Sequence, residues 1–279
     1  MAMRRTGALP GWCALIALLL ALAFEAIGQP SDAPTLAEAI EGAPAAYADR
    51  RVTSFEVLAG EDVTLFAGYF EDELEERILR VLHVFLRVGD GAWKHVWFSS
   101  SDATFRLGSV VRLYAAGDYF FVGLHRSPSA ETTAVLDRSL DHVGTINGWI
   151  VAAAPGGHAV FQRSMIHFSP THSPRLAIYD TESGRERDIY PPSEPTRTRV
   201  RISQAYAWLY EHLGDDWCYR RNHHCRAEVL NSSVFDVVVD AAFVDFSVRY
   251  RPPVMEMMPL EAVARYRHDR RAGATYELD

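Results

Sequence analysis

The chain has 279 residues, of which 48% are hydrophobic and 23% charged, with 28 Lys and Arg against 36 Asp and Glu. This is the composition of a globular protein with one large or two small domains, and it excludes an intrinsically disordered chain. The formal net charge of −8 argues against a general basic surface, so we expect no nucleic-acid partner.

The first 28 residues have the order of a secretory signal peptide. Arg4 and Arg5 give a basic start, residues 13–24 are apolar, and the small residues Ala26 and Gly28 suit a signal peptidase. We therefore predict cleavage after Gly28 and a secreted or periplasmic protein that keeps no stable membrane span. Cleavage removes two basic residues and one acidic residue, which leaves 26 against 35. The alternative is an uncleaved anchor, although a membrane span needs about 20 apolar residues.

Residues 29–50 are expected as a polar linker followed by a short helix, and residues 51–279 as a single β domain. Thr35 and Glu38 have the spacing of a capping box, and a glycine and a proline end the helix within about two turns. Beyond it, short apolar runs separated by glycine-containing turns predict strands. In chain order these strands are 51–58, 62–70, 78–88, 92–98, 110–114, 119–125 and 132–136.

Two segments of this region allow more than one interpretation. The charge run 71–77 is expected as a solvated loop or a turn of helix. Residues 78–88 fit one face of a helix as well as a strand. Because they lead through Gly89-Asp90-Gly91 into another apolar run, a hairpin is the better interpretation.

Residues 148–192 predict a four-stranded antiparallel unit that serves as the template for the whole domain. Pro155-Gly156-Gly157 ends its first strand, and Thr181-Glu182-Ser183-Gly184 turns its third strand into its fourth. The last hairpin, which ends in Ile-Tyr-Pro-Pro, resembles the outer two strands of a β-propeller blade. The expected strands are 149–154, 158–168, 176–180 and 185–190.

Two short repeats support that resemblance. Ala134–Asp137 matches Ala177–Asp180 at an offset of 43 residues, and Gly117–Phe121 precedes the similar Gly156–Val160 by about 38 residues. The resemblance, which covers residues 110–250, implies an all-β, propeller-like fold of antiparallel β-meander blades, with about five or six blades at most. The alternative is a β-sandwich in which the matches arise by chance.

An insertion interrupts the third cycle near residues 203–225. Ser203 can cap a short helix that ends at Gly214, and a cysteine-containing loop follows. Segment 260–266 is also compatible with a helical turn. The sheet resumes after the insertion, with strands expected at 234–239, 242–250, 262–267 and 274–278.

The mature chain keeps two cysteines, Cys218 and Cys225. In an exported protein a disulfide between them is the expected state. The alternative is a zinc site that these cysteines form with His223 and His224. Adjacent histidines point apart in extended backbone, and oxidation would consume the thiolates, so we expect no metal and no other cofactor.

The sequence has no Gly-x-Ser-x-Gly or His-Glu-x-x-His motif and no glycine loop for phosphate or a dinucleotide. A carboxylate pair assembled from distant positions stays open, with Asp102, Asp137, Asp180 and Asp240 as candidates. An aspartate that closes a strand more often holds a turn. The histidines outside the cysteine loop are scattered, and we expect them to be solvated or hydrogen-bonded.

The favoured function is an exported, non-catalytic module that binds an extracytoplasmic protein or glycan. The alternatives are an extracytoplasmic hydrolase or lyase with a carboxylate-based site, and a structural component of an envelope assembly. Aromatic residues expected at the surface support the binding function, namely Trp97, Tyr119, Trp149, Tyr190 and Trp217.

Overall fold

The structure is a computed structural model, in which residues Thr35–Asp279 form one compact unit. The expected signal peptide, the helix after Ser203 and both cysteines lie outside the residues that it describes, so these three remain predictions. None of the described helices is long and apolar enough to cross a bilayer. The described residues are 33–75, 80–101, 105–127, 130–154, 158–163, 175–201, 204, 231–251 and 262–279.

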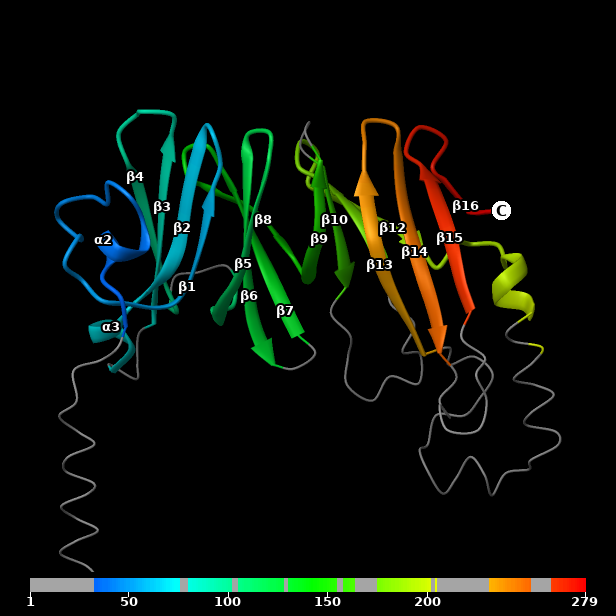
Figure 1. The fold of residues 1–279 in the computed structure, drawn as a ribbon, viewed down its shortest axis with the longest axis horizontal. Helices are drawn as coiled ribbons and strands as arrows, with labels where there is room; N and C mark the ends of the chain where they lie inside the picture. Colours follow the sequence, from blue (N-terminus) through cyan, green and yellow to red (C-terminus); the bar gives the residue numbers. More distant parts are fainter. Residues whose placement is uncertain are drawn as a thin grey trace, which may run out of the picture. The chain divides into compact units, whose positions relative to one another are not determined.

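The fold is all-β and consists, in the described part, of four antiparallel sheets of four strands, each made from consecutive strands (Figure 1). This confirms the propeller-like prediction of repeated meanders. The first two sheets contain β1 (Val52–Ala59), β2 (Val63–Phe70), β3 (Val81–Val88), β4 (Lys94–Ser99), β5 (Ser109–Ala116), β6 (Tyr119–Ser127), β7 (Ala130–Asp137) and β8 (His142–Ile146). The last two contain β9 (Gly148–Ala154), β10 (His158–Arg163), β11 (Leu176–Asp180), β12 (Arg185–Tyr190), β13 (Asn231–Val239), β14 (Phe243–Arg251), β15 (Ala262–Asp269) and β16 (Ala274–Leu278).

The short repeats in the sequence fall at equivalent places in the sheets. Ala134–Asp137 ends β7 and Ala177–Asp180 ends β11, and each of these is the third strand of its sheet. The second repeat falls in the same way on β6 and β10, the second strands. The repeats therefore mark equivalent strands of successive blades, and the offset of 43 residues is a blade period.

Two details of the observed structure bear on the strand predictions. In the segment 260–266, the described residues 262–266 belong to β15, which pairs with β14 and β16, and so do not form the alternative helical turn. The strand β8 was not expected. Among the described strands it pairs only with β7, at the edge of its sheet. It is short and contains a glycine, so it lacks the apolar alternation that identifies a half-buried strand.

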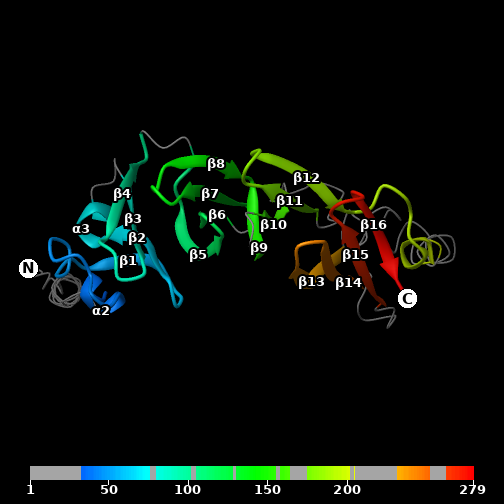
Figure 2. The same ribbon diagram turned by 90° about the horizontal axis from the view of Figure 1, so that it is seen from above.

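Each sheet shares a hydrophobic core with the next sheet in the chain. Figure 2 shows the sheets in this order from above. Successive residues of a strand point to opposite faces, and the cores follow this rule. On β6, Phe120 enters the core with the first sheet and Phe121 the core with the third sheet. On β10, Phe161 enters that same core and Val160 the core with the last sheet. Adjacent sheets are therefore held together by strands that are buried on both faces.

The segment that precedes β1 covers the outer face of the first sheet. Its short helix α2 (Leu36–Ala39) begins with the expected capping box, in which Thr35 and Glu38 each accept a hydrogen bond from the other's backbone N–H. Leu36 is fully buried against Phe66 and Phe85 of the sheet. A second helix, α3 (Glu71–Glu75), follows β2 at the expected charge run.

Candidate binding site on the last sheet

The outer face of the last sheet is exposed, in contrast to that of the first sheet. Val238, Val263 and Tyr276 on this face are 63%, 51% and 43% exposed. Strand pairing places them together, because one row of partners across the sheet runs from Val238 through Asp245 and Arg267 to Tyr276. We call these outward-facing residues of β13–β16 the open face.

An ion pair between Asp245 and Arg267 lies at the centre of the open face. Arg267 donates hydrogen bonds of 2.7 and 2.6 Å to the two carboxylate oxygens of Asp245. These bonds lower the pKa of the Asp245 carboxyl, so the pair stays ionised at neutral pH. The same guanidinium lies 4.9 Å from the ring centroid of Phe243. A bidentate, stacked arginine is held in one geometry, so a partner would meet a preformed surface.

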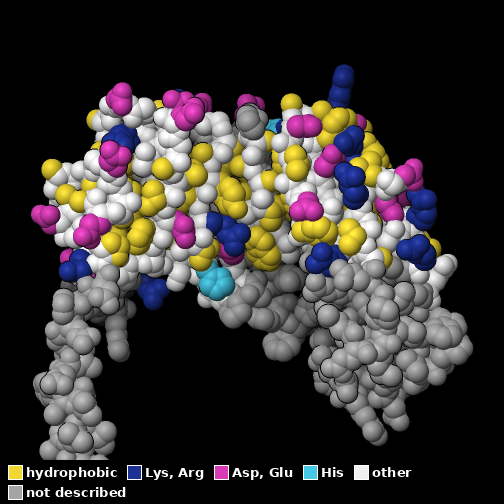
Figure 3. All heavy atoms as spheres, viewed as in Figure 1, with side chains coloured by type: hydrophobic (Ala, Val, Ile, Leu, Met, Phe, Trp, Pro, Cys, Tyr) yellow, Lys and Arg dark blue, Asp and Glu magenta, His cyan; other side chains and the backbone are white. Residues whose placement is uncertain are grey.

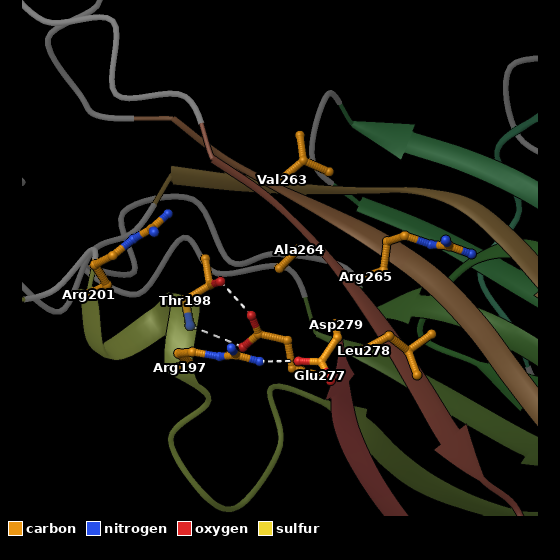
Figure 4. A pocket seen from close by; sticks show the side chains of 9 residues that line it. All are labelled: Arg197, Thr198, Arg201, Val263, Ala264, Arg265, Glu277, Leu278 and Asp279. Atoms are coloured by element: carbon orange, nitrogen blue, oxygen red, sulfur yellow. Dashed lines mark hydrogen bonds and ion pairs between the residues drawn. The ribbon is translucent and has the colours of Figure 1, made fainter.

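A pocket of about 400 Å³ lies beside the open face, where a helical turn over 197–201 approaches β15 and β16 (Figure 4). Arg197 and Arg201 come from the helical turn, and Arg265 comes from β15. Figure 4 shows Arg201 and Arg265 at opposite ends, with Val263 and Ala264 between them. The full lining is Arg197, Thr198, Arg201, Val263, Ala264, Arg265, Glu277, Leu278 and Asp279.

The two acidic side chains of the pocket are already occupied by hydrogen bonds. Glu277 accepts from the backbone N–H of Thr198 at 3.0 Å and from its hydroxyl group, and Asp279 accepts from Arg197. Burial raises the pKa of Glu277, but the bonds from Thr198 outweigh it and hold this pKa below its ordinary value. Arg201 and Arg265 form no ion pair or hydrogen bond with another described residue. The lining side chains therefore carry three guanidinium groups against two carboxylates.

The charged residues around the last sheet differ from the acidic balance of the whole chain. Lys and Arg side chains gather over this sheet in the space-filling view (Figure 3). The helical turn alone contributes Arg197, Arg199 and Arg201. An excess of positive charge at one place, in a chain of net charge −8, favours an anionic ligand there.

The aspartates considered for catalysis hold turns instead. The side chain of Asp137 accepts hydrogen bonds from the backbone N–H groups of Ser139 and Asp141. Asp180 and Asp240 do the same for the residues that follow them. Aspartate side chains commonly hold turns in this way, because they accept hydrogen bonds from backbone N–H groups two or three residues later. Asp102 lies outside the described residues.

The β3–β4 hairpin brings together His83 and His95, two histidines that the sequence analysis did not connect. The Nδ1 atom of His83 lies 3.0 Å from Nε2 of His95, and Nε2 of His83 lies 2.8 Å from a carboxylate oxygen of Glu73. Burial and repulsion from His83 lower the pKa of His95 to about 4. Both histidines are hydrogen-bonded, as expected for the scattered histidines, and no group of described residues has the arrangement of a metal site.

The expected surface aromatic residues have different outcomes. Trp97 is 55% exposed, as predicted, and Tyr119 and Trp149 are half-buried. The prediction for Tyr190 was wrong, because this residue is 2% exposed and packs in the core between the last two sheets. Its hydroxyl lies 3.0 Å from that of Tyr250, which satisfies the polar end of the buried ring. Trp217 lies outside the described residues.

Comparisons with known proteins give a likeness of fold only. No protein-family model matches the chain, and no curated protein sequence matches it. Among solved structures, the chain is similar to the "Crystal structure of HIRA(644-1017)", with 6% sequence identity and a TM-score of 0.42. The match covers 82% of this chain and 53% of that chain, so the described protein spans about half the length of its structural neighbour. The propeller-like description above depends on the strand pairing of this protein.

The open face and the pocket were not predicted from the sequence. The hydrogen bonds that build the pocket join the helical turn to β16 across about eighty residues of chain. One signal was present: alternation on residues 262–267 places Val263, Arg265 and Arg267 on one side. Such alternation of valine with arginine on the outer side of an expected strand indicates a surface with both apolar and cationic character.

Proposed function

We propose that this protein is an exported, non-catalytic module that binds a protein partner through the open face of its last sheet. The observation that carries this proposal is the exposure of Val238, Val263 and Tyr276 on a sheet face whose counterpart on the first sheet is covered. Aromatic residues and arginine are enriched at protein interfaces, and the open face contains both. Export remains part of the proposal because of the N-terminal sequence.

A catalytic function has less support. A glycosidase-type mechanism needs two carboxyl groups that face each other across a substrate. Asp137, Asp180 and Asp240 instead accept hydrogen bonds from the backbone of their own turns. A carboxylate in this position stabilises the turn and has fewer lone pairs free for a substrate.

The test of the proposal is partner capture by the mature protein with matched surface variants. Val238→Asp and Val263→Asp place a charge on the open face, while Val143→Asp places one on β8, where the valine is 45% exposed. We expect an extracytoplasmic protein to be retained by the wild type and by Val143→Asp, and lost with the other two variants.

Two results would contradict this function. Equal capture by all variants would show that the open face is not the interface. Turnover in a hydrolase screen, together with no variant-sensitive partner, would favour the enzymatic alternative. N-terminal sequencing of the exported protein tests the accompanying prediction that it begins at Gln29.

A further inference from the structure

We infer that the pocket beside the open face binds an acidic peptide segment of the partner, in which carboxylate and small aliphatic side chains alternate along the side that faces the pocket. This inference rests on the proposed function and deepens it, since it names the chemistry that the partner presents. The first step is the charge of the pocket. Glu277 and Asp279 are occupied by Thr198 and Arg197, so the ligand meets the two other guanidinium groups.

The second step is the position of these two arginines. Arg201 and Arg265 lie at opposite ends of the pocket (Figure 4). One small anion, such as phosphate, would be held at one end only. A ligand that engages both ends needs anionic groups at separate positions, and an extended peptide with acidic side chains provides them.

The third step is the apolar floor between the arginines. Val263, which is 51% exposed, lies between them, and Leu278, the partner of Arg265 on β16, continues the apolar lining on the same face. A polyanion such as nucleic acid or polyphosphate makes no use of this surface. Because alternate residues of an extended chain point to opposite sides, residues at every second position share one side. A peptide with an aliphatic residue two positions from each of two acidic residues therefore presents all three side chains to the pocket.

The test uses three labelled synthetic octapeptides and fluorescence anisotropy on the full mature protein. The Glu-Val peptide repeats Glu-Ser-Val-Ser, so that Glu and Val alternate on one side of the extended chain. The Gln-Val peptide repeats Gln-Ser-Val-Ser, and the Glu-Ser peptide repeats Glu-Ser-Ser-Ser. We expect saturable binding of the Glu-Val peptide, no measurable binding of the Gln-Val peptide, and weaker binding of the Glu-Ser peptide. Because exposed ion pairs screen with salt, the affinity for the Glu-Val peptide decreases as salt is added.

Substitutions assign the binding to the pocket. Arg201→Gln and Arg265→Gln are each expected to lower the affinity for the Glu-Val peptide by about fivefold, which is the upper range for a solvent-exposed ion pair. Arg106→Gln, at an exposed arginine between β4 and β5, is the matched control and leaves the affinity unchanged. If a glutamine variant fails to fold, Arg201→Lys and Arg265→Lys keep the charge but remove the planar donor, and they are expected to give a smaller loss.

The inference is overturned if the Glu-Val peptide does not bind, if the Gln-Val peptide binds equally well, or if neither arginine variant changes the affinity. Polyphosphate that binds more tightly than the Glu-Val peptide, and equally to Val263→Ser and wild type, would show a charge-only site and also overturn it. These failures leave the proposed function standing when Val238→Asp still abolishes partner capture, so the two are tested separately.

Discussion

A buried histidine makes the contact between the last two sheets sensitive to acid. His268 on β15 is 1% exposed. Arg187 of β12, which can only donate, lies 2.8 Å from its Nε2 atom, so this nitrogen is unprotonated. The proton is therefore on Nδ1, which donates to the hydroxyl of Thr275, and this hydroxyl donates to the carbonyl of Ile189. The chain of bonds requires the neutral imidazole.

The cost of acidification follows from the pKa of this residue. Burial, and then repulsion from Arg187, lower the pKa of His268 to about 4 from 6.5, with a smaller opposite effect of Asp269. Between these values the unfolded chain binds a proton that the folded protein does not, so stability is lost as the pH falls from above 6.5 towards 4. Proton linkage at His268 therefore lowers the free energy of unfolding by about 2 kcal/mol between pH 7 and pH 5.

The substitution His268→Gln tests this calculation. The glutamine amide can accept a hydrogen bond from Arg187 and donate one to Thr275, but it does not titrate. Between pH 7 and pH 5 the free energy of unfolding of the variant is therefore expected to fall by about 2 kcal/mol less than that of the wild type. Urea unfolding at pH 7 and pH 5 measures the difference. His83 and His95 titrate in both proteins and cancel, and His125→Gln, at an exposed histidine of β6, is the control. Equal losses in His268→Gln and wild type would refute the reasoning.

Three further substitutions have defined outcomes. Tyr250→Phe removes the central hydroxyl between Tyr190 and Tyr266 and should lower the free energy of unfolding by about 1.5 kcal/mol, measured by urea titration. Leu36→Ala empties a fully buried position and should cost about 3 kcal/mol, with faster hydrogen exchange in residues 35–50. Asp180→Ala removes the acceptor of two turn N–H groups and should cost about 1 kcal/mol with no effect on partner capture.

Each of these has its own contradicting result. Tyr276→Phe, at a 43% exposed tyrosine, should have little effect, and a loss as large as that of Tyr250→Phe would show that hydroxyl burial is not the cause. Unchanged hydrogen exchange in Leu36→Ala would mean that the segment before β1 is held by other contacts. Loss of partner capture in folded Asp180→Ala would give this carboxylate a binding role.

Local signals in the sequence predicted most of the fold. The turns were readable because they use glycine where the backbone is left-handed, as at Gly117, Gly184 and Gly273 with φ of 61°, 63° and 72°. The strands between them followed from apolar runs. The capping box at Thr35 was likewise a local pattern, and it formed as expected.

Local sequence patterns did not predict the contacts between segments that are distant in the chain. Tyr190 stands beside two prolines and resembles a surface residue, yet its hydroxyl meets Tyr250, which is sixty residues later in the chain. His83 and His95 looked unrelated, but the register of the β3–β4 hairpin pairs Phe85 with His95 and so places the histidines as diagonal neighbours. The centre of that hairpin was readable at Gly89-Asp90-Gly91, so this pair could have been found by counting outward from the turn.

The outer faces of the first and last sheets differ in exposure, and this difference bears on how copies of the protein could associate. Among the described residues, Leu36 and its neighbours cover the outer face of the first sheet, whereas the outer face of the last sheet exposes Val238, Val263 and Tyr276. Two copies that met through this surface would form an isologous pair and use up both available faces. Self-association through this surface alone would therefore stop at a dimer.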